Sequence, residues 1–102
     1  MVTSLVAEVG GRVAGFIMGS VYLGEFGIPE TIASIDTIGV DPEFQRQGVA
    51  GYMLEEFKTT VRKAGVDKIH TLVNWTDTDL LGFFADRGFV AANTLNLKLD
   101  VE

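Results

Sequence analysis

A change of hydrophobic period at one glycine constrains the fold of this chain more than any other feature. Before Asp41, apolar residues gather in β-rich runs. After Gly48 they recur at the i, i+3, i+4, i+7 spacing of one helix face, at Ala50, Met53, Leu54, Phe57, Val61 and Ala64. A polar loop of residues 41–47 therefore joins the end of a strand to the start of an amphipathic helix.

Glycine, proline and turn residues divide the rest of the chain into short elements. We expect an α/β (α+β) fold with the order β-β-β-α-β-α-β-β and a mixed, largely antiparallel sheet. Gly15 and Gly19, inside the second strand, indicate a bulge or a close backbone approach. The strands are predicted at Leu5–Val9, Val13–Leu23, Ile32–Val40, Lys68–Val73 and the alternating Leu95–Val101, the second helix at Asp79–Asp86, and a loop at residues 24–30.

Composition limits the classes of function. The 102 residues allow one compact domain, residues 1–102, and the absence of cysteine excludes disulfides, thiolate metal sites and a cysteine nucleophile. The net charge of −6 disfavours nucleic acid and anionic membranes and suits a cationic partner such as an amine. No apolar run reaches the ~20 residues of a membrane span and no signal peptide is evident, so we expect a cytoplasmic protein.

The loop before the first helix has the features of a phosphate site. Helix N-termini offer unpaired N–H groups and a partial positive charge to anions. Gly48 and the small Ala50 and Gly51 let a phosphate approach the backbone, and Gln45, Arg46 and Gln47 add side-chain donors. The loop lacks the Gly-Lys-Ser/Thr ending of a P-loop, and the chain lacks the G-x-G-x-x-G dinucleotide pattern.

The pattern Gln45-x-x-Gly48-x-Ala50 resembles the Gln/Arg-x-x-Gly-x-Gly/Ala signature of the GNAT-type N-acetyltransferases. The preceding strand, the following helix, the next strand and the segment of residues 80–89 also resemble that family in order and spacing, from Ser4 to the C-terminus. The resemblance implies a sheet with a splayed central strand pair, two flanking helices, and transfer of an acetyl group from acetyl-CoA to a primary amine of a small molecule or protein by direct attack in a ternary complex. It implies no metal.

The resemblance also implies positions for coenzyme A. The pantetheine arm would lie in the gap beside Ile38, Gly39 and Val40, whose strand would also supply an N–H to the developing oxyanion. The second helix would pack near the pantetheine and the thioester. The implied contacts further along are the pyrophosphate loop Gln45, Arg46, Gln47, Gly48, Val49, Ala50 and Gly51, and Asp77 and Phe83 at the second helix.

The sequence departs from the family in three respects. Phe84 stands where many members have a Tyr general acid, and phenylalanine cannot donate a proton. The usual N-terminal strand and helices are not found before Leu5, so we expect a short member of the family. The candidate base is Asp36, expected to share a face with Ile38 and Val40; its rivals are Glu25 and Glu30.

Other candidate residues have plain structural interpretations. His70 alternates with its neighbours on a short strand, Trp75 suits packing at a strand exit or the wall of an acceptor pocket, and Asp36 itself suits a solvated strand carboxylate. Tyr22 and Tyr52 are the only phenols, and neither is a strong replacement acid: Tyr22 would reach the cleft only if its strand runs beside Asp36.

Two functions from different classes follow. The first is an acetyl-CoA-dependent N-acetyltransferase. The alternative is a degenerate module that binds acyl-CoA or a partner protein without efficient transfer, which Phe84 and the short N-terminus favour. The apolar edge strand near Leu5 and the regular strand from Leu95 predict a homodimer.

Overall fold

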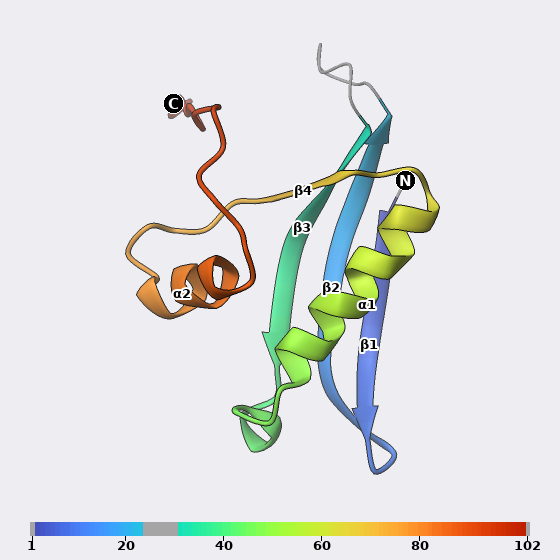
Figure 1. The fold of residues 1–102 in the computed structure, drawn as a ribbon. Coiled ribbons are helices and arrows are strands. Elements are labelled where there is room, and N and C mark those ends of the chain that lie inside the picture. Colours follow the sequence, from blue (N-terminus) through green and yellow to red (C-terminus); the bar gives the residue numbers. More distant parts are fainter. Residues whose placement is uncertain (1, 24–30, 102) are drawn as a thin grey trace. The chain divides into compact units, whose positions relative to one another are not determined.

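The structure, a computed structural model, describes residues 2–23 and 31–101. Along the chain these residues form β1 (Val2–Val9), β2 (Arg12–Leu23), β3 (Thr31–Val40), the short 3-10 helix η1 (Pro42–Phe44), α1 (Val49–Lys63), β4 (Lys68–Thr71) and α2 (Thr78–Asp86) (Figure 1). The predicted α/β class and the order of elements as far as α2 are confirmed. The expected loop at residues 24–30 lies outside the described residues, as do the rival bases Glu25 and Glu30.

The chain forms two compact units, Met1–Leu72 and Val73–Glu102, and each is described by itself. The first contains the sheet and α1, and the second contains α2. That residues 1–102 form one functional domain stays a prediction. No helix in the described part of the chain is long and apolar enough to cross a bilayer.

The sheet of the first unit has the order β1-β2-β3-β4. β1 pairs with β2 and β2 with β3 in antiparallel fashion, whereas β3 and β4 run parallel, so the sheet is mixed and largely antiparallel as predicted. Helix α1 packs across one face of β1, β2 and β3 (Figure 1). Its apolar stripe, the facing strand residues and one residue of the connection after α1 form the core: Ala14, Ile17, Val21, Ala33, Ile35, Val49, Met53, Leu54, Phe57, Val61 and Val66.

The two glycines inside β2 allow α1 to lie close to the sheet. A Cβ on Gly15 would lie 2.9 Å from the Cε of Met53, and a Cβ on Gly19 would lie 2.7 Å from the Cζ of Phe57. The register between β2 and β3 shifts between Met18 and Gly19. The close approach predicted at these glycines is therefore confirmed, whereas the bulge at this shift lies in β3, opposite Gly19, and not in β2.

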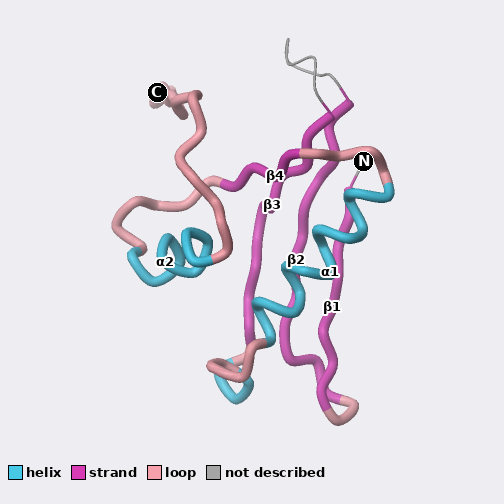
Figure 2. The backbone as a smooth tube through the Cα atoms, in the orientation of Figure 1, coloured by secondary structure: helices cyan, strands magenta, loops and turns pink. Residues whose placement is uncertain are grey.

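Strand β3 is paired with β4 along only part of its length. The parallel ladder runs from Ile32 opposite Lys68 to Ile35 opposite Thr71, and in the described residues β4 offers no partner to positions 36–40 of β3. Figure 2 shows the short β4 beside one end of β3. The predicted splay between the two central strands is present, and it leaves one side of β3 open next to the loop that leads to α1.

The second unit is built around α2. The Asp77 carboxylate caps this helix by accepting a hydrogen bond from the Leu80 N–H at 3.1 Å. Phe84 is 3% exposed and its ring centroid lies 4.8 Å from that of Phe89 and 5.2 Å from that of Phe83. Phe84 is therefore the packed aromatic centre of this unit.

The strands expected after α2 are not formed. Residues 89–101 have no regular secondary structure, and Leu95, Leu97, Leu99 and Val101 are 85–89% exposed. Alternation of apolar and polar residues fits a strand, but a strand exists only where another strand supplies hydrogen-bond partners. No described strand pairs with this segment, which corrects the prediction for Leu95–Val101.

Candidate functional site

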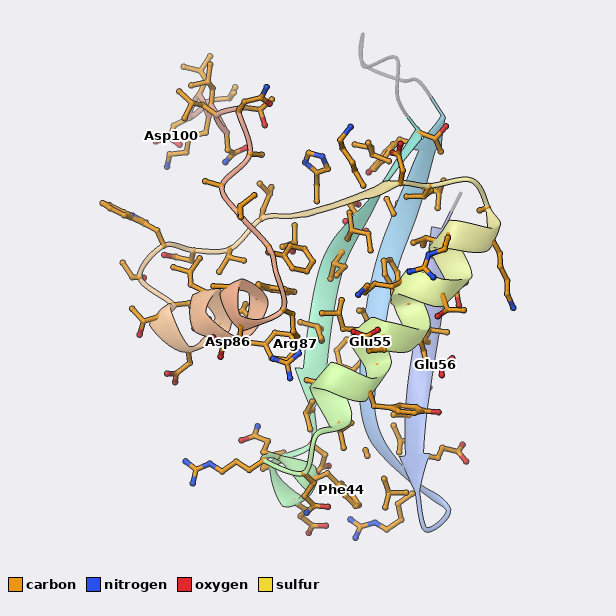
Figure 3. The ribbon with its side chains drawn as sticks, viewed as in Figure 1. Phe44, Glu55, Glu56, Asp86, Arg87 and Asp100 are labelled. Atoms are coloured by element: carbon orange, nitrogen blue, oxygen red, sulfur yellow. The ribbon has the colours of Figure 1, made fainter. Side chains whose placement is uncertain are left out.

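The loop between β3 and α1 is fixed to the sheet by short hydrogen bonds. The Asp41 N–H donates to the Ala14 carbonyl of β2 at 2.8 Å, and its carboxylate accepts from the Glu43 N–H at 2.9 Å. At the β1–β2 hairpin, Arg12 pairs with Glu43 at 2.6 Å, and its guanidinium lies 5.4 Å from the centroid of the Phe44 ring. Figure 3 shows Phe44 at the end of β3 where the chain turns toward α1. The loop is thus held by β2 and by the hairpin.

The side chains of the two glutamines of the loop donate hydrogen bonds to nearby backbone carbonyls. Gln45 Nε2 donates to the Val40 carbonyl at 3.2 Å, and Gln47 Nε2 donates to the Glu43 carbonyl at 3.1 Å. From the sequence, both side chains are predicted donors to a bound anion. The structure assigns one amide hydrogen of each to the backbone, so their observed role is to shape the loop.

Two left-handed residues set the path of the loop into α1. Arg46 has φ 65° and Gly48 has φ 81°. Glycine adopts this region freely, whereas an arginine there carries a cost of about 1–2 kcal/mol. Non-glycine residues held in this region concentrate at ligand-binding and catalytic sites. Arg46 is exposed, so its guanidinium extends from the loop into solvent.

The N-terminus of α1 is free to receive an anion. Gly48 is the N-cap residue, no side chain caps the helix, and its first turn holds no acidic residue. A Cβ on Gly48 would meet nothing within 4 Å, so the space above the backbone is open. Val49 is buried beneath this end of the helix, and Ala50 and Gly51 are half-buried. The N–H groups of the first turn therefore have no side-chain partner and adjoin open space at Gly48, as an anion site at a helix N-terminus requires.

The strand beside this loop presents its residues to both sides of the sheet. Ile38 and Val40 are opposite Ile17 and Gly15, on the face that α1 covers. Gly39 faces the other way, and a Cβ there would lie 2.7 Å from the Phe16 ring. The side of β3 that β4 leaves open, residues 36–40, adjoins the loop. The structure thus brings residues 38–40 and residues 45–51 together at one end of β3.

Asp36 lies on the other face of the sheet. In the β2–β3 register, Met18 is opposite Thr37 and Gly19 is opposite Ile35, so Asp36 is the extra residue of a β-bulge. One extra residue inverts the alternation beyond it. The expectation that Asp36 shares a face with Ile38 and Val40 is therefore wrong: Ile38 is opposite the fully buried Ile17, whereas Asp36 is exposed.

Two serines that are absent from the sequence-based candidates hold Asp36. The Ser20 hydroxyl donates to one carboxylate oxygen at 3.1 Å, and the Ser34 hydroxyl donates to the other at 2.9 Å. Ser20 and Ser34 are opposite each other in the register of β2 and β3. The signal for Ser34 was present, because residues two apart on a strand share a face. Ser20 could be found only from the register.

Of the remaining candidates of the first unit, His70 adjoins Ser34, whereas the two tyrosines lie apart from Asp36. His70 is opposite Ser34 across the β3–β4 ladder and is half-buried. β2 does run beside β3, but Tyr22 is opposite Ile32, at the far end of β3 from the loop. Tyr52 is 64% exposed on α1.

In the second unit, the candidate residues serve local structure. Asp77 caps α2, Phe83 is 4.0 Å from the Arg87 guanidinium, and Phe84 is buried. Trp75 is 85% exposed, so packing does not explain it. Across residues 2–23 and 31–101, no group of three or more His, Asp or Glu side chains is placed to hold a metal ion.

Comparison with known proteins shows which family and which solved structures this chain is similar to. The model of the acetyltransferase (GNAT) family matches residues 2–89. Among solved structures, the aminoglycoside acetyltransferase meta-AAC0020 from an uncultured soil metagenomic sample, in complex with sisomicin, is similar with a TM-score of 0.83 at 16% identity, over 99% of this chain and 66% of that one. The ribosomal-protein-alanine N-acetyltransferase from Brucella melitensis biovar Abortus 2308 is similar with a TM-score of 0.82 at 17% identity, over 98% and 71%.

A third structure contains a coenzyme A derivative. AAC(6')-Iy in complex with the bisubstrate analog CoA-S-monomethyl-acetylneamine is similar with a TM-score of 0.82 at 18% identity, over 98% of this chain and 69% of that one. At these identities the likeness shows the fold. The chain spans about two thirds of the length of the structures it matches.

Proposed function

The chain belongs to the acetyltransferase (GNAT) family, and we propose that it transfers an acetyl group from acetyl-CoA to a primary amine by direct attack in a ternary complex. The observation that carries this proposal is the N-terminus of α1. It has no side-chain cap, no acidic residue in its first turn and open space above Gly48. These are the properties that a pyrophosphate requires of a helix end.

The donor would bind along the end of β3. Its pyrophosphate would accept hydrogen bonds from the first N–H groups of α1, with Arg46 adding positive charge from the loop. Its pantetheine arm would pair with the open side of β3 at residues 38–40, as an extended chain pairs with a sheet edge. A backbone N–H of the same stretch would stabilise the oxyanion that forms on the thioester carbonyl. The roles of Asp77 and Phe83 toward coenzyme A stay predictions.

The acceptor would be an amine that is protonated, and therefore cationic, before it reacts. The net charge of −6 favours the approach of a cation. An alkylammonium with a pKa of about 10.4 is almost entirely protonated at neutral pH, so it must lose a proton before it attacks. The candidate base that would accept this proton is the carboxylate of Asp36, which is in β3. The similar proteins named above act on aminoglycosides and on an alanine of a ribosomal protein, which supports an amine acceptor of either small-molecule or protein origin.

The departing thiolate receives no proton from Phe84. This side chain is 3% exposed and has no acidic hydrogen. A thiol with a pKa of about 8.5 is a tolerable leaving group, so transfer can proceed with the donor and the amine held in register. We therefore expect slow turnover compared with members that have a Tyr acid, since a general acid contributes about 10²–10⁴-fold.

Release of free thiol separates transfer from binding. Acetyl-CoA is incubated with the protein and with sisomicin, an alanine-initiated peptide or 1,5-diaminopentane, and free thiol and acetylated amine are measured together. We expect equal amounts of both products with at least one amine. Saturable acetyl-CoA binding by calorimetry without either product would support the alternative, an acyl-CoA-binding module. Absence of acetyl-CoA binding would contradict both transfer and acyl-CoA binding, and would leave only a module that binds a partner protein.

We also propose that the chain associates as a homodimer. β1 is an edge strand, and the sheet face opposite α1 exposes Val6, Val13, Phe16 and Met18, which are 38–61% exposed. Such edges and apolar faces favour pairing with another chain. Light scattering at micromolar concentration should give twice the monomer mass of 11.0 kDa. A single-chain mass with full acetyl-CoA binding would contradict the dimer.

A further inference from the structure

The ring of Phe16 takes the place of the side chain that Gly39 lacks. The two residues are opposite each other in the antiparallel pair of β2 and β3, so their side-chain positions share one face of the sheet. A Cβ on Gly39 would lie 2.7 Å from the Cε1 and 3.0 Å from the Cζ of Phe16. The ring therefore reaches from β2 over the backbone of β3, on the face away from α1.

The protein covers only part of this ring. Phe16 is 38% exposed, and Val6, which is opposite it in β1, is 61% exposed. The other face of the sheet is closed at the same level, because Ile38 is opposite Ile17, which is fully buried under α1. Of the two faces, the face of Phe16 is therefore the one with exposed surface beside residues 38–40.

This ring lies where the reacting end of the donor is proposed to bind. The donor would pair with the open side of β3 at residues 38–40, and an N–H of this stretch would stabilise the oxyanion on the thioester carbonyl. Gly39 is the middle residue of the stretch. Successive positions along a strand point to opposite faces, so a group at the level of Gly39 points to the face of the Phe16 ring. The acyl chain is attached directly to the thioester carbonyl and would therefore lie against this ring.

We propose that Phe16 limits the length of the acyl group that the protein accepts. The proposal rests on the proposed binding of acetyl-CoA along β3 and adds to it the specificity for the acyl chain. The single methyl group of an acetyl ends beside the ring. The methylenes of a butyryl or hexanoyl group meet the volume that the ring fills, and overfilling a packed site opposes binding. Phe16 is thus a specificity-determining residue that takes no part in proton transfer.

The test compares the affinities of acetyl-, propionyl-, butyryl- and hexanoyl-CoA for the full chain by calorimetry. We expect the wild type to bind butyryl-CoA about ten-fold or more weakly than acetyl-CoA, as small pockets discriminate against added methylenes. Phe16→Ala should reverse this order, because each methylene that enters the vacated volume favours binding by about four-fold. Phe16→Leu removes only part of the ring volume and should give an intermediate selectivity.

Val6→Ala is the matched control. Val6 lies on the same face as Phe16, but one strand further from β3. It belongs to the same exposed apolar face, so its truncation also controls for a change in association of the chain. The order of the four affinities should stay as in the wild type. Equal affinities for all four donors in the wild type, or an equal change of order in Val6→Ala, would overturn the proposal.

The same measurements separate this proposal from the proposed function. With an amine that is acetylated, Phe16→Ala should raise kcat/KM for butyryl-CoA relative to acetyl-CoA and leave the KM for the amine unchanged. Saturable acetyl-CoA binding with the wild-type order of affinities kept in Phe16→Ala would overturn the acyl limit and leave the proposed function standing. Length selection that depends on Phe16, without any acetylated amine, would support the acyl limit and overturn the proposed transfer. No binding of any acyl-CoA by the wild type would overturn both.

Discussion

Replacing Gly48 with valine should lower acetyl-CoA affinity by about 100-fold or more, which is about 2.7 kcal/mol of binding free energy. The branched side chain would fill the open space above the N-terminus of α1, where the pyrophosphate is proposed to lie. The measurement is isothermal calorimetry of acetyl-CoA on variants whose folding is checked by circular dichroism.

Gly65→Val is the matched control for backbone strain. Gly65 follows the other end of the same helix, has φ +87° against +81° for Gly48, and likewise offers open space, because a Cβ added there would meet nothing within 4 Å. Both substitutions put a β-branched residue in the left-handed region and should lower the stability by a similar amount. Only Gly48→Val should lose affinity for acetyl-CoA. Equal affinity losses in the two variants would show that strain, and not occlusion, explains the effect.

Ala50→Glu tests the charge of the same site without strain. A glutamate in the first turn of a helix stabilises it by about 0.3–1 kcal/mol through the helix dipole. The same carboxylate would repel a pyrophosphate, so acetyl-CoA binding should be lost while the melting temperature stays the same or rises. Ala50→Gln, of the same size and uncharged, should keep more of the affinity. Retained affinity in Ala50→Glu would contradict the phosphate site.

The part of the fold that local patterns determine could be predicted from the sequence. The apolar stripe from Met53 to Val61 predicted α1, and the turn at Gly10 and Gly11 predicted the β1–β2 hairpin. The splay beside residues 38–40 followed only from the family resemblance, because nothing in the local sequence of β3 states where β4 stops pairing.

The face on which Asp36 lies could not be predicted. A strict alternation puts residues 36, 38 and 40 on one side, and a single extra residue reverses that assignment. The bulge depends on how β2 and β3 align across the sheet, which is a property of two strands and not of either sequence. The same is true of Ser20, which reaches Asp36 only through that register.

The segment after α2 shows that alternation of apolar and polar residues is not sufficient evidence for a strand. Leu95, Leu97 and Leu99 alternate with polar residues as regularly as any strand, yet the segment is unpaired and exposed. The free energy of a strand comes from its neighbours, through ladder hydrogen bonds and packing on one face. A pattern can therefore mark a segment as able to pair without providing the partner.

Phe57→Ala should be the most destabilising single truncation in the first unit. Phe57 is fully buried on α1, and its ring packs against the bare backbone of Gly19 in β2. Its removal leaves a cavity that α1 cannot close without shifting on the sheet, at a cost of about 3–5 kcal/mol. The melting temperature should fall by roughly 12 °C or more. Tyr52→Ala, an aromatic truncation on the same helix at a side chain that is 64% exposed, should change the unfolding free energy by less than about 0.5 kcal/mol.

Adding acetyl-CoA to these variants tests whether the packing of α1 on the sheet affects acetyl-CoA binding at the N-terminus of the helix. A ligand at 100 times its Kd stabilises the native state by about 2.7 kcal/mol. Phe57 lies about two and a half turns beyond Gly48, and the loop is held independently of it by the Asp41–Ala14 and Gln45–Val40 hydrogen bonds. Phe57→Ala should therefore gain as much thermal stability from acetyl-CoA as Tyr52→Ala does, whereas Gly48→Val, with an affinity at least about 100-fold lower, should gain only about 0.4 kcal/mol or less at the same concentration. If acetyl-CoA stabilises Tyr52→Ala but not Phe57→Ala, the packing of α1 on the sheet is needed to form the phosphate site. The hydrogen bonds of the loop would then not be sufficient to form it.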